Sequence, residues 1–441
     1  MSSLIVELKS RVSKTAREWT MRMPVFCTAV LTYVVIGHPP TAVAQVEQQR
    51  AQEFFKEAQA VCERDGGRLW GVSICMPMVI GDARTQTFAT SQPPPDAPRP
   101  KLIGLLNGPI QWGDTMWAAL TWDTVAPQTP RVRSGMFIHE SFHIVQMRLG
   151  LGVGTVSAEH LDSVEGRYWM RLEWRALARA LRESGEPRAL AIREALAFRQ
   201  ARHARYPDKV ETERALDINE GLASYTQAVL PAQSEADAIA SALDGLTAAE
   251  GGESFVRTFA YASGPAYGLL LDAASPGWTR KVRASDDLAT LLAHALAIQP
   301  VADASAAAAR YGGAQLRAAE EQREQQRQAR IAELRLQFVD GPVLLMPGGG
   351  GGLSNSLGAV VIPDVGTIYF HAYRMKGEWG ALEADKGVLV SSDGNSRRLP
   401  APVRGDGATI SGDGWTLKPA PGWVVREGTR RGDYELVRQQ P

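Results

Sequence analysis

The sequence predicts an α+β fold, in which a mostly helical region follows a small sheet and a small β domain ends the chain. Three observations support this fold class. Stretches of helical composition fill most of the chain between residues 134 and 297. Two shorter stretches before them, rich in apolar and β-compatible residues, have the composition of strands. After residue 338, Gly-Asp turns separate short alternating segments, which is typical of a β domain.

The first 44 residues have the features of an export signal. An apolar run over residues 24–36 follows Arg22, and Ala42-Val43-Ala44 provides a small-x-small cleavage pattern. We therefore expect cleavage after Ala44 and a periplasmic or secreted protein. The alternative is an uncleaved leader that anchors the chain in a membrane, although the apolar run is short for a bilayer span.

Residues 45–100 are expected to form an N-terminal segment closed by a disulfide. The chain has three cysteines, and only Cys62 and Cys75 remain after removal of the leader. In an exported chain, two cysteines a short loop apart commonly form a disulfide, so we predict this bond. A metal site at the pair is disfavoured, because the spacing is not C-x-x-C and no histidine lies nearby. A proline-rich linker over residues 93–100 ends the segment.

Residues 101–300 are expected to form the central, mostly helical domain. Leu102–Leu106 and Thr115–Trp122 have the composition of strands. A helix follows, which Ser134 could cap and Gly150 could end. The next two long helices, over about 164–183 and 187–205, make a hairpin. Its arginines and glutamates at mixed spacing favour a solvated, salt-bridged face. Residues 208–229 are again helical.

The end of the chain divides into a connecting helix and a β domain. Residues 301–338 contain a charged stretch, from about Ser305 to Phe338, that is typical of a connecting helix. Residues 339–441 form the predicted β domain, with an alternating pattern over 358–370. The glycine run over 348–352 lacks the lysine and hydroxyl residue of a phosphate loop, so we interpret it as a flexible turn.

Charge argues against some classes of partner. The chain has 48 basic and 48 acidic residues, which cancel. There is consequently no global field of the kind that attracts nucleic acid or an anionic membrane, and we expect no nucleic-acid partner.

The strongest chemical signal is the motif His139-Glu140-Ser141-Phe142-His143, an H-E-x-x-H pattern. On a helix, residues four apart lie on the same face, so His139 and His143 can bind one ion. Glu140 lies beside them, where it can take a proton from a water that attacks a carbonyl carbon. The polar residues of this apolar helix, which include Gln146, cluster on one side. This ligand set predicts Zn²⁺.

A catalytic zinc normally has three protein ligands and one open position. Glu220, within Asn219-Glu220-Gly221-Leu222-Ala223-Ser224-Tyr225, is the best candidate for the third ligand, because a glutamate on a second, packed helix can complete a His-His-Glu site. The glycine beside it allows the helices to approach closely. Glu165, Glu173 and Glu213 remain alternative ligands. Asp217, one helical turn before Glu220, is either a hydrogen-bond acceptor that orients the site or a plain carboxylate on the helix face.

H-E-x-x-H followed by N-E-G-x-A-x-Y resembles the gluzincins, the thermolysin-like zinc metallopeptidases, and above all their aminopeptidase N and leukotriene hydrolase branch. The resemblance covers motifs within about residues 115–271 and implies a zincin-like catalytic domain. Tyr261-Ala262-Ser263-Gly264 resembles that branch's Y-x-x-G segment, whose tyrosine donates a hydrogen bond to the oxyanion. The resemblance thus gives that role to Tyr261, with Tyr267 as a substitute.

Two departures from that branch limit what the resemblance implies. The interval between His143 and Glu220 is much longer, since it holds the helical hairpin. The G-A-M-E-N segment that binds the free amine of a substrate is not present, so aminopeptidase specificity has no support, although the Thr115–Trp122 strand could pair with an extended peptide.

We therefore expect a zinc metallopeptidase that acts on a peptide or protein substrate. The rival prediction is an inactive periplasmic binding or scaffold protein that keeps the zinc site. Glu140 argues against the rival, because it serves catalysis rather than metal binding. Four other histidines stand alone without ligand-spaced partners and are expected to be surface or hydrogen-bonded residues: His160, His203, His294 and His371.

Overall fold

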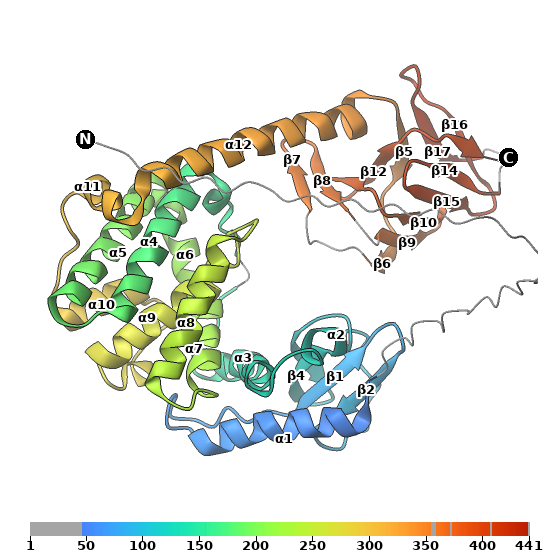
Figure 1. Ribbon diagram of the computed structural model, residues 1–441. Helices are drawn as coiled ribbons and strands as arrows, with labels where there is room; N and C mark the ends of the chain where they lie inside the picture. Colours follow the sequence, from blue (N-terminus) through green and yellow to red (C-terminus); the bar gives the residue numbers. More distant parts are fainter. Residues whose placement is uncertain (1–45, 155, 354–358, 371–372, 406–407, 440–441) are drawn as a thin grey trace, which may run out of the picture. The chain divides into compact units, whose positions relative to one another are not determined.

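The computed structural model describes the chain apart from residues 1–45, 155, 354–358, 371–372, 406–407 and 440–441 (Figure 1). The predicted export signal thus lies outside the described residues. Within the described part, none of the helices combines the length and apolar character that crossing a membrane requires. The described chain is α+β, with a helical region followed by a β region.

The chain first forms a four-stranded sheet with the order β2-β1-β4-β3. Its strands are β1 (Met78–Asp82), β2 (Thr87–Thr90), β3 (Gly108–Trp112) and β4 (Thr115–Thr121). β1 and β4 are parallel, whereas the other neighbours are antiparallel. The sheet therefore joins strands from both sides of the proline-rich linker and spans the boundary expected near residue 101.

One of the two predicted strands is wrong. Residues 101–105 form turns, and the strand before β4 begins only at Gly108. Gly104 has a φ of +87°, which interrupts an extended backbone, and its Cα lies close to the backbone of Asp82 and Ala83. Leu102 and Leu105 point toward solvent as a result. The predicted strand over 115–122 is confirmed as β4.

Alternation along the strands separates the two faces of the sheet. Ile80 and Leu120 face a core that includes Phe54 and Phe55 of helix α1 (Gln48–Asp65) and Phe137 of helix α3 (Pro130–Arg148). α1, α3 and β4 lie together in Figure 1. Trp112 and Trp117 cover the opposite face. One face of the sheet thus provides the apolar surface on which α3 packs.

Helix α3 begins earlier than the sequence predicted. Thr129 is its N-cap, with a side-chain oxygen that accepts from the amide of Val132, and Pro130 occupies the first turn. The prediction that Ser134 caps the helix is wrong, because Ser134 is buried in the second turn. The helix ends at Arg148, next to Gly150 as expected.

The predicted disulfide is confirmed: Cys62, near the end of α1, is bonded to Cys75, and their Cα atoms are 5.4 Å apart. The bond fixes the chain that leads from α1 into β1. A loop of this length is expected to raise the free energy of unfolding by about 3 kcal/mol.

The central core consists of helices. The long pair α4 (Val164–Arg182) and α5 (Gly185–Arg205) confirms the predicted hairpin. The remaining helices of this region are α2 (Trp122–Val125), α6 (Val210–Leu216), η3 (Asp217–Gly221), α7 (Leu222–Val229), α8 (Glu235–Glu250), α9 (Phe259–Ala274), α10 (Leu288–Leu296) and α11 (Ala304–Ala308). Apart from α2, which packs in the core of the four-stranded sheet, their apolar faces meet in one continuous core that also includes α3.

Only some of the hairpin's charged residues form the solvated, salt-bridged face that the sequence favoured: Arg182 and Arg193 are exposed, but others are buried. Arg202 is fully buried and pairs with Glu173 at 2.6 Å and with Glu213 at 2.7 Å. Arg199 is buried beside it and pairs with Asp217 at 2.6 Å. Charges are buried only when they are paired, so this network ties α4, α5, α6 and η3 together.

We expect Arg202→Met to lower the free energy of unfolding by about 3–5 kcal/mol, because it removes the cation that pairs with two buried carboxylates, Glu173 and Glu213. Denaturant unfolding measures the change. The matched control is Arg330→Met on α12 (Gly313–Arg335), whose arginine is exposed in a pair with Glu333, and a change within about 0.5 kcal/mol is expected there. Equal effects in the two variants would contradict the structural role of the network.

Helix α12 leads into the β domain. Glu320 in its first half pairs with Arg167 of α4 at 2.8 Å. At its other end, Leu334 and Phe338 pack on Ile368 and Leu389 of a sheet. The connecting helix that the sequence placed at about 305–338 is thus α11, α12 and the wider turn η6 (Leu336–Asp340).

The β domain contains two sheets, with the orders β13-β14-β15-β10-β9-β6 and β16-β17-β5-β12-β11-β8-β7. Their strands are β5 (Val343–Pro347), β6 (Gly351–Leu353), β7 (Val360–Ile362), β8 (Gly366–Tyr369), β9 (Tyr373–Gly377), β10 (Gly380–Ala384), β11 (Val388–Ser391), β12 (Ser396–Pro400), β13 (Arg404–Gly405), β14 (Ile410–Gly412), β15 (Trp415–Pro419), β16 (Trp423–Glu427) and β17 (Tyr434–Arg438). Leu344, Leu382 and Leu417 belong to the core that they share.

The glycine run is only in part the turn that the sequence predicted. Gly351 and Gly352 belong to β6, which pairs with β9. A Cβ on Gly352 would collide with the carbonyl oxygen of Arg374 on the neighbouring strand. Glycine at this position therefore permits a close approach of two backbones.

Candidate metal centre

The H-E-x-x-H residues lie in the middle of α3. The Nε2 atoms of His139 and His143 are 3.1 Å apart, and the Oε2 atom of Glu220 lies 3.5 Å from the first and 3.3 Å from the second. The two histidines and the glutamate are the one group of metal-ligating side chains found among the described residues. The structure thus brings together all three predicted ligands.

These distances fit a metal ion. Nitrogen and oxygen ligands at about 2.0–2.2 Å from a tetrahedral zinc lie about 3.3 Å from one another. Two imidazole nitrogens that face each other cannot both donate a hydrogen bond. The Oε2 atom of Glu220 is buried and, in the described chain, has no hydrogen-bond partner. A cation among the three atoms satisfies all of them at once.

The backbone around Glu220 aims its side chain at the histidines. Glu220 lies in η3, a wider turn in which the amide of Leu222 donates to the carbonyl of Asp217, five residues earlier. Such π-turns are frequent at functional sites. Gly221 lies against α9, where an added Cβ would lie 3.3 Å from the Cα of Gly264. Gly221 thus permits a close helix approach, but to α9 rather than to the histidine helix for which the sequence predicted it.

The alternative third ligands lie elsewhere. Glu173 and Glu213 belong to the buried network around Arg202. Glu165 pairs with Arg317 of α12. None of the three is grouped with the histidine pair. Their arginine partners explain why these carboxylates can be buried or half-buried without a metal.

Two of the four lone histidines are hydrogen-bonded, as the sequence predicted. His160 and His203 contact the carboxylate of Glu213, at 2.7 and 3.1 Å. His294 is exposed, and His371 lies outside the described residues.

Gln146 forms hydrogen bonds that orient one of the candidate ligands. Its Oε1 lies 3.0 Å from Nδ1 of His143, so that Nδ1–H donates to it and Nε2 is left free to bind a metal. Its Nε2 donates to the carbonyls of Ile218 and Asn219, at 2.6 and 3.2 Å. One side chain therefore connects the histidine helix to the turn that carries Glu220.

Asp217 does not have the role predicted for it. Its Oδ2 accepts from Arg199, and the side chain forms no hydrogen bond with either histidine of the site. Burial raises the pKa of Asp217 to about 7, although the positive charge of Arg199 acts in the opposite direction. The residue belongs to the buried network. Gln146 was the missed supporting residue, and its position three residues after His143, on the same helix face, was the signal.

The electrostatics of the site favour proton transfer by Glu140. Burial raises its pKa above the usual value, and Glu220 adds to the effect, whereas His139 and His143 oppose it. A raised pKa makes a carboxylate a better proton acceptor near neutral pH. Burial also raises the pKa of Glu220, but the nearby imidazoles of His139 and His143 and the Tyr261 side chain outweigh it, so the net pKa is lowered and the carboxylate stays ionised.

Tyr261 lies at the site, whereas its proposed substitute does not. The Tyr261 ring stacks on that of His139, with centroids 5.5 Å apart and planes at 8°. The residue is 44% exposed and lines the cleft. Burial and the charge of Glu220 raise its pKa, which keeps the hydroxyl protonated as a donor. Tyr267 is fully buried and donates to Glu173 instead.

The site opens into a cleft of about 710 Å³. The metal-ligating residues, Glu140 and Tyr261 line one side of it. Gly108 and Pro109 line it from β3, which is the edge strand of the four-stranded sheet. The expectation that the 115–122 strand pairs with a peptide is therefore wrong, because β4 lies between β1 and β3 and both its edges are occupied. Arg148 and Arg257 also line the cleft.

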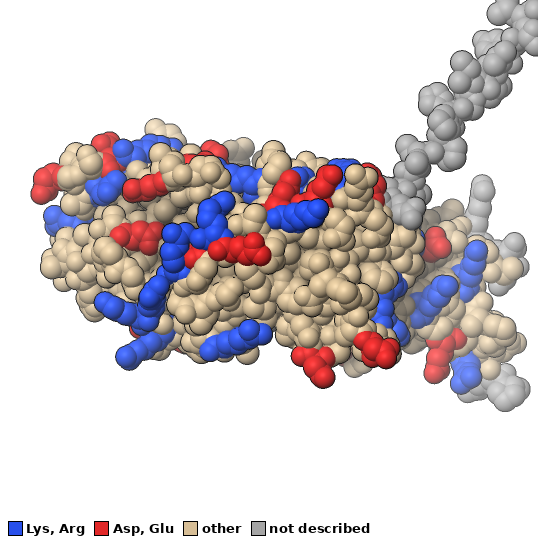
Figure 2. All heavy atoms as spheres, turned by 90° about the horizontal axis from the view of Figure 1, so that it is seen from below, with Lys and Arg blue, Asp and Glu red and all other residues tan. Residues whose placement is uncertain are grey.

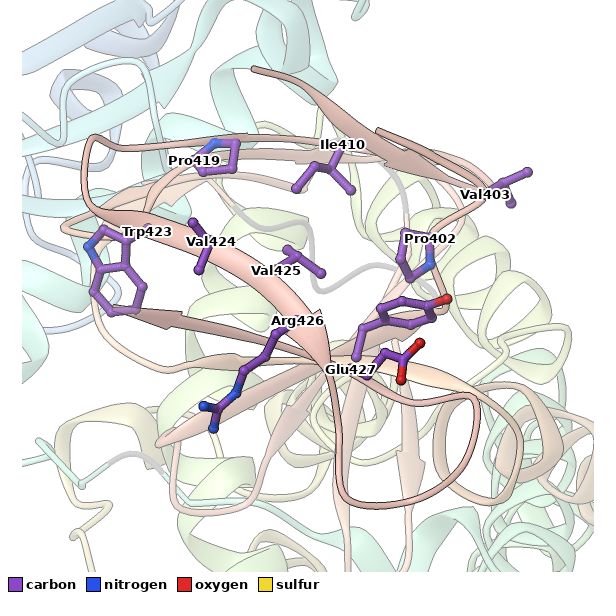
Figure 3. A pocket seen from close by; sticks show the side chains of 10 residues that line it. Pro402, Val403, Ile410, Pro419, Trp423, Val424, Val425, Arg426 and Glu427 are labelled. Atoms are coloured by element: carbon purple, nitrogen blue, oxygen red, sulfur yellow. The ribbon is translucent and has the colours of Figure 1, made fainter. Parts of the chain in front are cut away.

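A second cavity, of about 500 Å³, lies in the β domain (Figure 3). Trp423, Val425 and Tyr434 line it together with prolines and aliphatic side chains. Arg426 and Glu427 are its only charged residues, and none of its lining residues is a histidine or cysteine. Among the described residues, the side chains grouped as a candidate metal site lie on α3 and η3 rather than at this cavity.

A comparison with protein-family models, with curated proteins and with solved structures found no match to this chain.

Proposed function

We propose that this chain is a zinc-dependent hydrolase of the gluzincin type that cleaves amide bonds in peptides. The observation that carries the proposal is the triangle formed by the His139 Nε2, His143 Nε2 and Glu220 Oε2 atoms, with sides of 3.1–3.5 Å. That size fits a tetrahedral zinc, and Glu140 lies in the same cleft as the three ligands.

Bound zinc supplies a Lewis acid that polarises the substrate carbonyl and increases the acidity of the attacking water. Glu140 accepts the proton of that water and passes it to the leaving amine, a role that its raised pKa favours. Tyr261 donates its hydroxyl proton in a hydrogen bond to the oxyanion that develops. Gln146 keeps the His143 ring in one tautomer and one orientation.

The edge strand β3 provides a place for an extended substrate. Its outer edge has no strand partner among the described residues, and its first residues line the cleft. A peptide that lies along this edge can form backbone hydrogen bonds with it, which bind without selecting a sequence. Export of the chain, the other part of the proposal, agrees with the Cys62–Cys75 disulfide.

The proposal is tested by hydrolysis of a library of internally quenched peptides. We expect cleavage by the zinc-loaded protein, loss of cleavage after removal of the metal with a chelator, and recovery when zinc is added back. Stoichiometric zinc without cleavage of any member of the library would favour the inactive binding protein instead.

Gln146→Leu is expected to lower zinc affinity by about 10–100-fold, since it removes the acceptor that orients His143. Competition with a chromophoric chelator measures the affinity. Gln128→Leu, near the start of the same helix but outside the site, is the matched control and should bind zinc like the wild type. Unchanged affinity in Gln146→Leu would contradict the supporting role.

A further inference from the structure

Two arginines of the cleft have no carboxylate committed to them. Arg148 forms no hydrogen bond or ion pair with any residue in the described part of the chain. Arg257 is 56% exposed, and its nearest acidic oxygen is Oε1 of Glu220 at 3.9 Å. That distance is too long for a hydrogen bond, so the donors of both guanidinium groups remain available to a ligand.

The two cleft arginines differ in this respect from the buried arginines of the helical region. Those are paired with carboxylates, as in the Arg202 network and the Arg167–Glu320 pair. On the face shown in Figure 2, basic and acidic side chains are interspersed. The carboxylates that line the cleft are Glu220, a proposed metal ligand, and Glu140, the proposed general base. With a divalent cation bound, the cleft is therefore positive, although the whole chain has no net charge.

The alternative role for Arg257 is to stabilise the charge of Glu220. Asn219 already contacts the Oε1 atom of that carboxylate at 3.4 Å, and Oε2 faces the two histidines. Stabilising the charge of Glu220 therefore does not require Arg257. An exposed arginine at the rim of a reaction site is instead well suited to a planar, bidentate contact with a carboxylate of a ligand.

We propose that Arg257, assisted by Arg148, binds a carboxylate of the substrate close to the bond that is cleaved, so that the cleft selects anionic peptides. This inference rests on the proposed peptidase function and specifies its substrate class. The carboxylate can be the free C-terminus of a peptide or the side chain of Asp or Glu. Field focusing in a positive cleft also attracts such peptides from solution.

The test uses the zinc-loaded, full-length Glu140→Gln protein, so that peptides bind without turnover. The probes are peptides that differ only in a C-terminal acid or amide, and a second pair, amidated at the C-terminus, that differs only in an internal Glu or Gln. Calorimetry measures their affinities. In one of the pairs we expect the charged form to bind about 10–100-fold more tightly, the range of a charge-assisted contact. The pair that responds identifies the source of the carboxylate.

Adding Arg257→Met to this protein should reduce the preference to less than about threefold and leave zinc content unchanged, whereas the control Arg330→Met should retain it. Equal affinities within both pairs, or a preference that survives Arg257→Met, would overturn the inference. Loss of zinc in Arg257→Met would show that Arg257 stabilises Glu220 as a metal ligand, and this result would also overturn the inference. If the wild type cleaves neutral peptides as readily as anionic ones, only this inference is refuted. If it cleaves no peptide, the proposed function is refuted.

Discussion

Glu140→Gln is expected to keep one zinc per chain and to lose about 10²–10⁴-fold in turnover, the usual contribution of a general base. The amide has nearly the shape of the carboxylate but cannot accept the proton of the attacking water. Metal binding should survive, because Glu140 is not among the three side chains that face one another. Elemental mass spectrometry gives the zinc content, and cleavage of a quenched peptide gives the rate.

Glu186→Gln is the matched control, since Glu186 is an exposed carboxylate in the first turn of α5. Its turnover should equal that of the wild type. Full activity in Glu140→Gln would refute the mechanism, and loss of zinc in this variant would mean that Glu140 is itself a ligand.

Glu220→Ala is expected to reduce zinc affinity by more than about 100-fold, because it removes one of three protein ligands. The two histidines remain, so weak residual binding is expected rather than none. Turnover should fall with zinc occupancy. Titration against a chelator measures the affinity, and the unfolding transition of the metal-free protein shows whether the variant is folded.

Glu213→Ala tests whether Glu213 is a metal ligand or a member of the buried ion-pair network only. Glu213 holds Arg202 at 2.7 Å within the buried network, so its loss should lower the free energy of unfolding by about 3–5 kcal/mol. Zinc affinity of the folded protein should stay close to that of the wild type. Loss of zinc in Glu213→Ala with retention in Glu220→Ala would reverse the assignment.

The local chemistry of the site could be predicted from the sequence because it depends on one helix. The spacing of His139 and His143 places both rings on one face of any α-helix, whatever surrounds it. The disulfide followed in the same way from the number and proximity of two cysteines. The hairpin helices and the β domain could also be predicted, since their patterns and turn residues are local.

The partners of the buried charges were decided by the tertiary structure alone. The sequence around Glu220 favoured it as the third ligand, but Glu173 and Glu213 are also glutamates in helical sequence, and helical pattern alone did not show that they are partners of an arginine. Packing makes the distinction, because α5 brings Arg202 to Glu173 and Glu213, whereas Gln146 of α3 connects the turn that carries Glu220 to the histidine helix.

Long-range packing also decided the partner of Asp217, the identity of the edge strand and the residues that line the cleft. Asp217 is one helical turn from Glu220, yet Arg199 approaches it from another helix. β3 became the open edge because β1, from beyond the proline-rich linker, pairs with the far side of β4. Sequence periodicity determines which face of an element is apolar. Which elements meet at that face, and hence where Arg257 lies, depends on long-range packing that a single sequence does not reveal.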